Sequence, residues 1–123
     1  MIIWLASYPK SGNTWLRALL SSYYYSENGI FQFDLLKKIK QFPEKNFFLE
    51  FTKNFERPTV TAQYWLKAQN KINENKKINF FKTHNSLCNI NGNNFTNKKN
   101  TLGCIYIIRD PRNILTSIKN HYE

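Results

Sequence analysis

The sequence predicts an α/β fold in which a parallel β-sheet is flanked by helices. Three short apolar runs, at residues 2–7, 78–83 and 104–108, have the length of buried strands and are too short for helices. Segments whose apolar residues recur at helical spacing lie between and after these runs. Strands that alternate with helices in this way pair in parallel, and the helices cover the faces of the sheet.

The strand at residues 2–7 is followed by a polar loop. Residues 8–14 read Tyr-Pro-Lys-Ser-Gly-Asn-Thr and consist of turn-forming residues. The helical spacing of apolar residues begins at Trp15, and Asn13 or Thr14 would cap this helix at its N-terminus. The chain therefore opens as a strand, a polar loop and a helix.

Two further helices are expected in the centre of the chain. A turn at residues 28–29 ends the opening unit, and a short helix capped by Asp34 follows over residues 34–39. Residues 44–58 are aromatic but show no regular period, so the sequence predicts no element there. A longer helix is expected over residues 61–74, where the apolar residues again share one face.

The last part of the chain contains a loop, a strand and a helix. Residues 85–100 are rich in Asn and Lys and are expected to form a loop with a turn at residues 91–92. The strand that follows contains Cys104, which we expect in the hydrophobic core. A helix then starts at Pro111, because proline suits the first helical turn, and it continues to the chain end. The residues expected to point inward from this helix are Ile114, Leu115 and Ile118.

The composition indicates a folded basic protein. In 123 residues, 18 Lys and Arg stand against 8 Asp and Glu, which gives a formal net charge of +10. A hydrophobic content of 41% excludes a disordered basic tail. The abundance of Lys and Asn is typical of an AT-rich genome, so we expect most lysines on the surface and predict no specific nucleic-acid partner.

The predicted location is cytoplasmic, without a membrane span. No apolar run approaches the roughly 20 residues that a transmembrane helix needs. The N-terminal apolar run is too short for a signal peptide and has no basic segment before it. Cys88 and Cys104 form neither a CxxC pair nor a disulfide framework, which favours a reducing compartment.

Polar groups follow the three predicted strands at the point where each strand ends. Residues 10–14 follow the first strand, residues 82–84 end the second, and Arg109 follows the third. Ligands of open α/β sheets bind at this edge. A loop that leads into a helix presents unpaired N–H groups and the positive end of the helix dipole, so it binds anions, and Gly12 would let a phosphate approach closely.

The loop departs from the nucleotide-binding pattern GxxxxGK[ST]. When Gly12 is aligned with the second glycine, Ser7 takes the place of the first glycine and Asn13 the place of the lysine. The cation has moved into the loop, to Lys10, which disfavours an ordinary ATP- or GTP-hydrolysing site. A P-loop-like kinase and a non-enzymatic basic module that binds polyanions remain as alternatives.

Three segments resemble sulfotransferases that use 3′-phosphoadenosine 5′-phosphosulfate (PAPS). Residues 7–17, Ser-Tyr-Pro-Lys-Ser-Gly-Asn-Thr-Trp-Leu-Arg, resemble the 5′-phosphosulfate loop, in the form found in bacterial-type members. Residues 109–117, Arg-Asp-Pro-Arg-Asn-Ile-Leu-Thr-Ser, resemble the 3′-phosphate segment. Residues 81–84, Phe-Lys-Thr-His, are similar to the strand that carries the catalytic histidine. The resemblance implies a P-loop-like three-layer fold.

The resemblance also implies the roles of individual residues. His84 would be the general base, Lys10 would stabilise charge on the leaving phosphate, and Trp15 would stack on adenine. Taken alone, Trp15 would more simply be a core residue. PAPS would be the co-substrate, no metal would be needed, and a hydroxyl or amine on a small molecule, glycan or lipid would accept the sulfuryl group. The residues implied to bind PAPS are Lys10, Ser11, Gly12, Asn13, Thr14, Trp15, Arg109 and Ser117.

The resemblance extends over residues 2–123 and implies that residues 1–123 form a partial sulfotransferase domain without a second domain. The resemblance implies that the family domain continues beyond the segments found here, and we expect its C-terminal part, which completes the nucleotide site, to be missing from this chain. We therefore expect weak or undetectable activity from this chain alone. The sequence predicts no oligomeric state.

Overall fold

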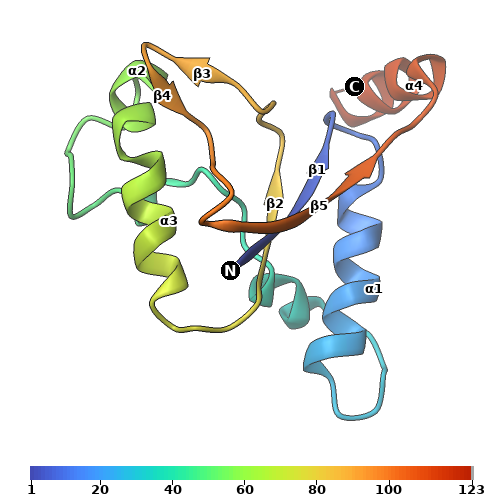
Figure 1. Ribbon diagram of the computed structural model, residues 1–123. Coiled ribbons are helices and arrows are strands. Elements are labelled where there is room, and N and C mark those ends of the chain that lie inside the picture. Colours follow the sequence, from blue (N-terminus) through green and yellow to red (C-terminus); the bar gives the residue numbers. More distant parts are fainter. Residues whose placement is uncertain (123) are drawn as a thin grey trace.

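The computed structural model describes residues 1–122 and contains a three-stranded parallel sheet (Figure 1). β1 (Ile2–Ser7) lies at the centre, between β2 (Asn79–Thr83) and β5 (Thr101–Ile107). Both pairings are parallel. The predicted α/β class with a parallel sheet is confirmed, and the strands lie within three residues of their predicted bounds.

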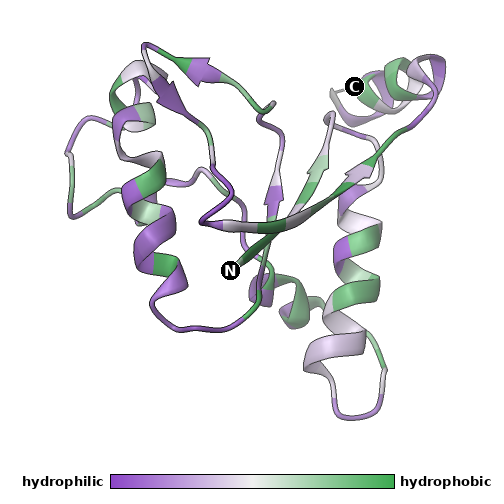
Figure 2. Cartoon of the chain, viewed as in Figure 1, coloured by the Kyte–Doolittle hydropathy of each residue, from purple (hydrophilic) through white to green (hydrophobic). Residues whose placement is uncertain are grey.

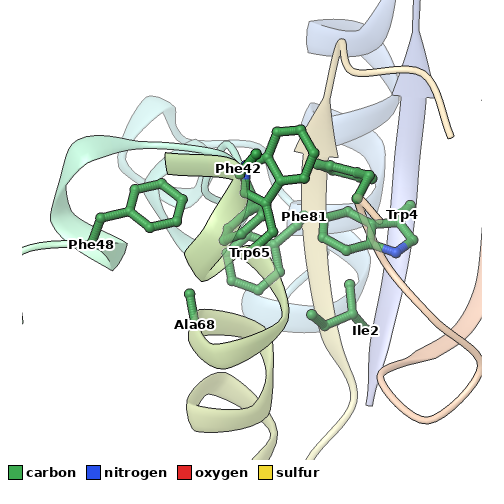
Figure 3. Close-up of a cluster of buried hydrophobic side chains, with 9 residues drawn as sticks. Ile2, Trp4, Phe42, Phe48, Trp65, Ala68 and Phe81 are labelled. Carbon is green, nitrogen blue, oxygen red and sulfur yellow. The ribbon is translucent and has the colours of Figure 1, made fainter. Parts of the chain in front are cut away.

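The side chains of β1 pack on both faces of the sheet. Ile2 and Trp4 belong to the larger hydrophobic cluster, which α3 (Trp65–Asn73) covers (Figure 3). Leu5 belongs to a smaller cluster on the opposite face, against α1 (Asn13–Tyr25). Hydrophobic colour accordingly runs through β1 in Figure 2. A strand buried on both faces is apolar almost throughout, which explains why this strand was readable from the sequence.

The first helix begins where expected, but its cap differs from the prediction. The N-cap of α1 is Gly12, with φ of 101°, and no side chain bonds to the first turn. The prediction of Asn13 or Thr14 as the cap was therefore wrong. The amide of Asn13 is unavailable for capping because it is buried and donates hydrogen bonds to β1.

The short helix that follows is a 3-10 segment, η1 (Phe33–Lys38), which lies one residue before the predicted range of 34–39. Its N-cap is Gln32, and no side chain caps it. Asp34 lies inside the first turn, so its carboxylate forms an exposed ion pair with Lys37 at 2.6 Å instead of capping the helix.

The longer helical region starts earlier than the predicted range of 61–74. It consists of α2 (Pro58–Thr61), η3 (Ala62–Tyr64) and α3. Pro58 occupies the first turn, where its missing N–H is no loss, and this fixes the start of the region. Before it, the segment without a predicted element contains only the 3-10 turn η2 (Lys45–Phe47).

The segment predicted as a loop contains a small hairpin, so this prediction was wrong in part. β3 (Asn89–Ile90) pairs with antiparallel β4 (Asn93–Asn94), and the turn predicted at residues 91–92 joins them. Phe95 anchors the hairpin, because it is buried in the larger cluster with its ring centroid 5.1 Å from that of Trp4.

β5 lies at the edge of the sheet, and much of it is exposed. Cys104 is exposed, in contrast to its predicted place in the core, because no described element covers that side of β5. α4 (Pro111–Tyr122) starts at Pro111 as predicted. Of its residues expected to point inward, Ile114 is buried, whereas Leu115 is 68% exposed.

Candidate active site

A cavity of about 500 Å³ lies at the carboxyl ends of the three parallel strands. Its walls come from the loop after β1, the start of α1, the end of β2, Arg109 after β5, and α4. Of the site residues predicted from the sequence, all except Ser11 line this cavity. The lining residues are Pro9, Lys10, Gly12, Asn13, Thr14, Trp15, Lys82, His84, Arg109, Ser117 and His121.

The loop between β1 and α1 has the geometry of an anion site. Lys10 has φ of 64° and Gly12 has φ of 101°, so left-handed residues alternate along the loop. Such alternation turns successive N–H groups toward one point, and the N-terminus of α1 adds its dipole there. Nothing lies within 4 Å of the position that a Cβ on Gly12 would occupy, which leaves room for a ligand close to the backbone.

Ser11 is part of this loop but is buried, with only 6% of its surface exposed. Its N–H donates to the carbonyl of Tyr8 at 3.3 Å, and the residue lines a neighbouring apolar cavity together with Ile114. The predicted contact of Ser11 with PAPS therefore stays a prediction.

The side chain of Asn13 fastens the start of α1 to the end of β1. Its Nδ2 donates to the carbonyl of Leu5 at 2.8 Å and to the hydroxyl of Ser7 at 3.1 Å. Asn13 and Ser7 are 4% and 5% exposed, so both bonds are shielded from water. The Oδ1 atom of Asn13 is buried without a hydrogen-bond partner in the described chain.

His84 follows β2 directly and reaches across to β1. Its Nδ1 lies 2.7 Å from the carbonyl oxygen of Ser7 and 3.5 Å from the Ser7 hydroxyl. A carbonyl oxygen only accepts, so Nδ1 carries the hydrogen of this contact. In the neutral ring, Nε2 then keeps its lone pair. His84 is exposed, so a ligand in the cavity can reach this nitrogen.

The cavity is positively charged. Lys10, Lys82 and Arg109 contribute to its lining, whereas no Asp or Glu among residues 1–122 does. Burial lowers the pKa of Lys82, and the positive charge of Arg17 lowers it further. A bound anion would balance the positive charge of the cavity.

Lys82 was not assigned a role from the sequence, although one signal was present. A lysine within the apolar run Phe-Phe-Lys-Thr of a buried strand is unusual, because lysine is seldom buried without a reason. On the outer side of β2, the N–H of Lys82 donates to the carbonyl of Lys40 at 2.9 Å, and its own carbonyl accepts from the N–H of Phe42 at 2.8 Å. Its backbone position is therefore fixed on both sides.

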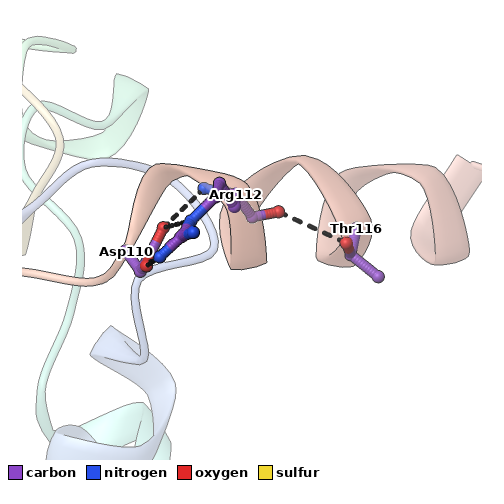
Figure 4. A network of polar contacts seen from close by, with 3 residues as sticks. All are labelled: Asp110, Arg112 and Thr116. Atoms are coloured by element: carbon purple, nitrogen blue, oxygen red, sulfur yellow. Dashed lines mark hydrogen bonds and ion pairs between the residues drawn. The ribbon is translucent and has the colours of Figure 1, made fainter.

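The two arginines near the start of α4 have different surroundings. Arg112 is paired with Asp110, and the shortest contact is 2.6 Å (Figure 4). Hydrogen bonds from Arg112 lower the pKa of Asp110. Arg109 has no carboxylate partner among residues 1–122, and its Nη1 donates to the carbonyl of Lys10 at 3.0 Å. Arg109 is thus the arginine that lies over the anion-binding loop.

α4 contributes two residues to the cavity. Ser117 was predicted from the resemblance, whereas His121 was not singled out. His121 lies four residues after Ser117, which places the two on the same helix face, so the helical spacing was a usable signal. No group of three or more His, Cys, Asp or Glu side chains suited to hold a metal occurs in the part of the chain that the structure describes.

Trp15 and Arg17, neighbours on α1, have contrasting roles. Trp15 is 73% exposed, so it is not a core residue. It lies between the site cavity and a second cavity of about 440 Å³, which is lined by apolar residues of α1 and of residues 29–36. Arg17 is structural, because it donates to the carbonyls of Leu36 and Ile39 at 2.8 and 2.7 Å.

Residues 2–123 match the sulfotransferase domain family. The match covers nearly the whole chain, and the chain therefore belongs to this family, whose members are transferases of sulfuryl groups. The predicted membership is confirmed, and a three-layer fold with helices on both sides of a parallel sheet agrees with it. No curated protein and no solved structure gives a significant match. Within residues 1–122, no helix combines the length and hydropathy needed to cross a membrane.

Proposed function

We propose that the sulfotransferase domain to which this chain belongs takes the sulfuryl group from PAPS and transfers it to a hydroxyl or amine, with His84 as the general base and without a metal, and that this chain alone has weak or undetectable activity. The observation that carries the proposal is that an anion-binding loop, Arg109 and His84 meet in one cavity. Each comes from the end of a different strand, and their charges suit a donor with phosphates at two positions.

The donor would lie along the loop and the start of α1. Backbone N–H groups of residues 12–14, with the hydroxyl of Thr14, hold the 5′-phosphate. Arg109 and Ser117 hold the 3′-phosphate from the other side of the cavity. Trp15 is exposed at the rim and offers its ring to adenine, for which the adjoining apolar cavity leaves room.

His84 and Lys10 would act on the reacting atoms. Nε2 of His84 takes the proton of the acceptor as the acceptor oxygen or nitrogen forms a bond to sulfur. The bond between sulfur and the bridging phosphate oxygen breaks, and Lys10 stabilises the negative charge that develops on that oxygen. The other product is adenosine 3′,5′-bisphosphate. The Ser7 carbonyl, which holds Nδ1–H, stabilises the imidazolium that results.

Metal independence is part of this proposal. Lys10, Lys82, Arg109 and the dipole of α1 supply positive charge where the phosphates would lie. Turnover is therefore expected to be unchanged by EDTA. A loss of turnover that Mg²⁺ restores would contradict this part.

A cavity of about 300 Å³ beside the donor site is the proposed place for the acceptor. Its lining combines apolar side chains, Phe48 and Phe55 among them, with the charged Glu44 and Lys45, and it reaches Asn85, the neighbour of His84. The indole N–H of Trp65, which also lines it, is buried without a hydrogen-bond partner in the described chain. An acceptor with an apolar body and an oxygen atom suits this lining, whether it is a small molecule or part of a lipid or glycan. We place the reaction in the cytoplasm, because Cys88 and Cys104 are both free.

The test is transfer of ³⁵S from labelled PAPS to a panel of phenols, alcohols and amines by a protein that contains the complete sulfotransferase domain, because the 123-residue chain alone is expected to show weak or undetectable activity. His84→Ala is expected to lower turnover by at least about 100-fold, the usual size of a general-base contribution, and to leave binding of the bisphosphate nearly unchanged. Retained turnover in His84→Ala would refute the general-base role.

Binding experiments separate the two other classes. Magnesium-dependent ATP binding that PAPS fails to displace would support a kinase instead. Binding of polyanions that falls steeply with salt and is insensitive to Lys10→Ala would support a basic binding module.

A further inference from the structure

A hydrogen-bonded connection links the start of α1 to His84 through the end of β1. Asn13 donates from Nδ2 to the Ser7 hydroxyl, and the Ser7 carbonyl accepts from Nδ1 of His84. Ser7 is the last residue of β1, and it pairs with Ile107 of β5 but has no partner in β2. The second bond of Asn13, to the carbonyl of Leu5, holds the same strand end from two residues back.

The position of the Ser7 carbonyl decides which nitrogen of His84 carries the proton. In water, an imidazole ring exchanges between its two neutral tautomers. The Ser7 carbonyl oxygen, held 2.7 Å from Nδ1, accepts a hydrogen bond and so selects the Nδ1–H form. Only in this form is Nε2 free to take a proton from the substrate that accepts the sulfuryl group. A displacement of Ser7 would release the ring and allow the form in which Nε2 already carries hydrogen.

We infer that Asn13 is a positioning residue for His84, and that it acts through Ser7 to hold the Nδ1–H tautomer. The inference rests on the proposed role of His84 as the general base. It differs from the role implied by the family resemblance, which assigns Asn13 to the nucleotide. The side-chain amide is instead committed to β1, and only the backbone N–H of Asn13 remains for a phosphate.

The same contact fixes the distance between the two halves of the site. Asn13 and Ser7 are the two ends of the loop that carries Lys10 and Gly12, and the bond between them closes that loop. The anion-binding loop and the base therefore share one anchor, buried at both ends. Within residues 1–122, two side chains contact the Ser7 hydroxyl: that of Asn13, at 3.1 Å, and that of His84 itself, at 3.5 Å. Substitution of Asn13 therefore disturbs the base most directly.

The tautomer of His84 is measured by ¹H–¹⁵N long-range NMR of the labelled 123-residue chain. The spectra are recorded about two pH units above the usual histidine pKa, so that the ring is neutral. The native chain is expected to show Nδ1–H. In Asn13→Ala, the ratio of Nδ1–H to Nε2–H is expected to fall at least about five-fold, the effect of losing one net hydrogen bond. Native His84 in the Nε2–H form, or an unchanged ratio in Asn13→Ala, overturns the inference.

Gln69→Ala is the matched control. Gln69 is also a fully buried amide, and it donates to the carbonyl of Phe95 at 2.6 Å on the far side of the sheet. It is expected to lower stability and to leave the His84 tautomer unchanged. An equal change of tautomer in Gln69→Ala would mean general loosening and would overturn the inference.

Ser7→Ala decides the matter if Asn13→Ala fails to fold. This variant keeps the backbone carbonyl and removes only the hydroxyl that Asn13 holds. A shift toward Nε2–H supports the inference, and an unchanged ratio overturns it. The measurement needs neither donor nor acceptor, so it can be made on this chain whatever its activity. If the complete domain fails to transfer the sulfuryl group, the proposed function is refuted while the positioning result stands. If the sulfuryl group is transferred but the tautomer is unchanged in these variants, this inference alone is refuted and the proposed function stands.

Discussion

Substitution of Arg109 tests the proposed recognition of the 3′-phosphate. Arg109 extends from the end of β5 over the loop, and one of its N–H groups is bonded to the carbonyl of Lys10. The planar guanidinium has further donors, which can bind a phosphate in the cavity. Arg109→Ala removes these donors and the positive charge, and it leaves the loop backbone in place.

The expected size of the effect follows from the contacts. A hydrogen bond to a charged group contributes about 1.5–3 kcal/mol, so the affinity for adenosine 3′,5′-bisphosphate is expected to fall roughly 10- to 150-fold. The hydrogen bond from Arg109 to the carbonyl of Lys10 is exposed to solvent, and its acceptor is uncharged. Its loss costs about 0.5–1 kcal/mol, and the affinity for the 5′-monophosphate is therefore expected to fall less than about six-fold.

Isothermal titration calorimetry with both nucleotides measures the two effects at the same salt concentration. Arg112→Ala is the control, since Arg112 lies three residues after Arg109, carries the same charge and is already paired with Asp110. This variant is expected to bind both nucleotides like the native chain. Equal losses for the two nucleotides in Arg109→Ala would refute the assignment of Arg109 to the 3′-phosphate.

Three further predictions concern stability. Lys82→Met is expected to stabilise the fold by a few tenths to about 1 kcal/mol near neutral pH, after allowance for solvent exposure, and to weaken anion binding. Because burial and Arg17 lower the pKa of Lys82, the folded state binds this proton less tightly than the unfolded state, so native stability should rise with pH below the usual lysine pKa. Urea midpoints that show no such rise relative to Lys82→Met would contradict this reasoning. Gly12→Ala should cost about 1–2 kcal/mol through its φ of 101° alone, and urea denaturation with an unchanged midpoint would argue against the left-handed conformation. Phe95→Ala should cost about 3–5 kcal/mol by thermal denaturation, and a loss below about 1 kcal/mol would show that Phe95 does not anchor the hairpin.

The sequence predicted the parts of the fold that depend on local patterns. The run Ile2–Ser7 reads as a strand because both of its faces are buried. Pro111 marks the start of α4 because its ring suits a first helical turn. The site edge follows from parallel pairing alone, since parallel strands end together, and this brought His84 and Arg109 to one cavity.

What the sequence did not predict depends on contacts between distant residues. Asn13 is a good N-cap by residue type, and only the nearby end of β1 draws its amide inward. Phe95 is the single apolar residue of residues 91–100, so the sequence shows no periodic pattern that would predict the hairpin that Phe95 anchors. Cys104 lies in an apolar run, yet it is exposed because no described element covers that side of β5, and which faces are covered is decided by distant parts of the chain.

The central place of β1 has a consequence for how the chain folds during synthesis. β1 leaves the ribosome long before its partners β2 and β5, which are made much later. Contacts between residues so far apart in sequence form slowly, because long loops must close before any pairing is gained. The apolar segment Ile2–Ser7 therefore lacks its first partner strand until the nascent chain has passed Thr83, and its second until the chain has passed Ile107. Until then, it is a binding site for chaperones and a point of risk for aggregation.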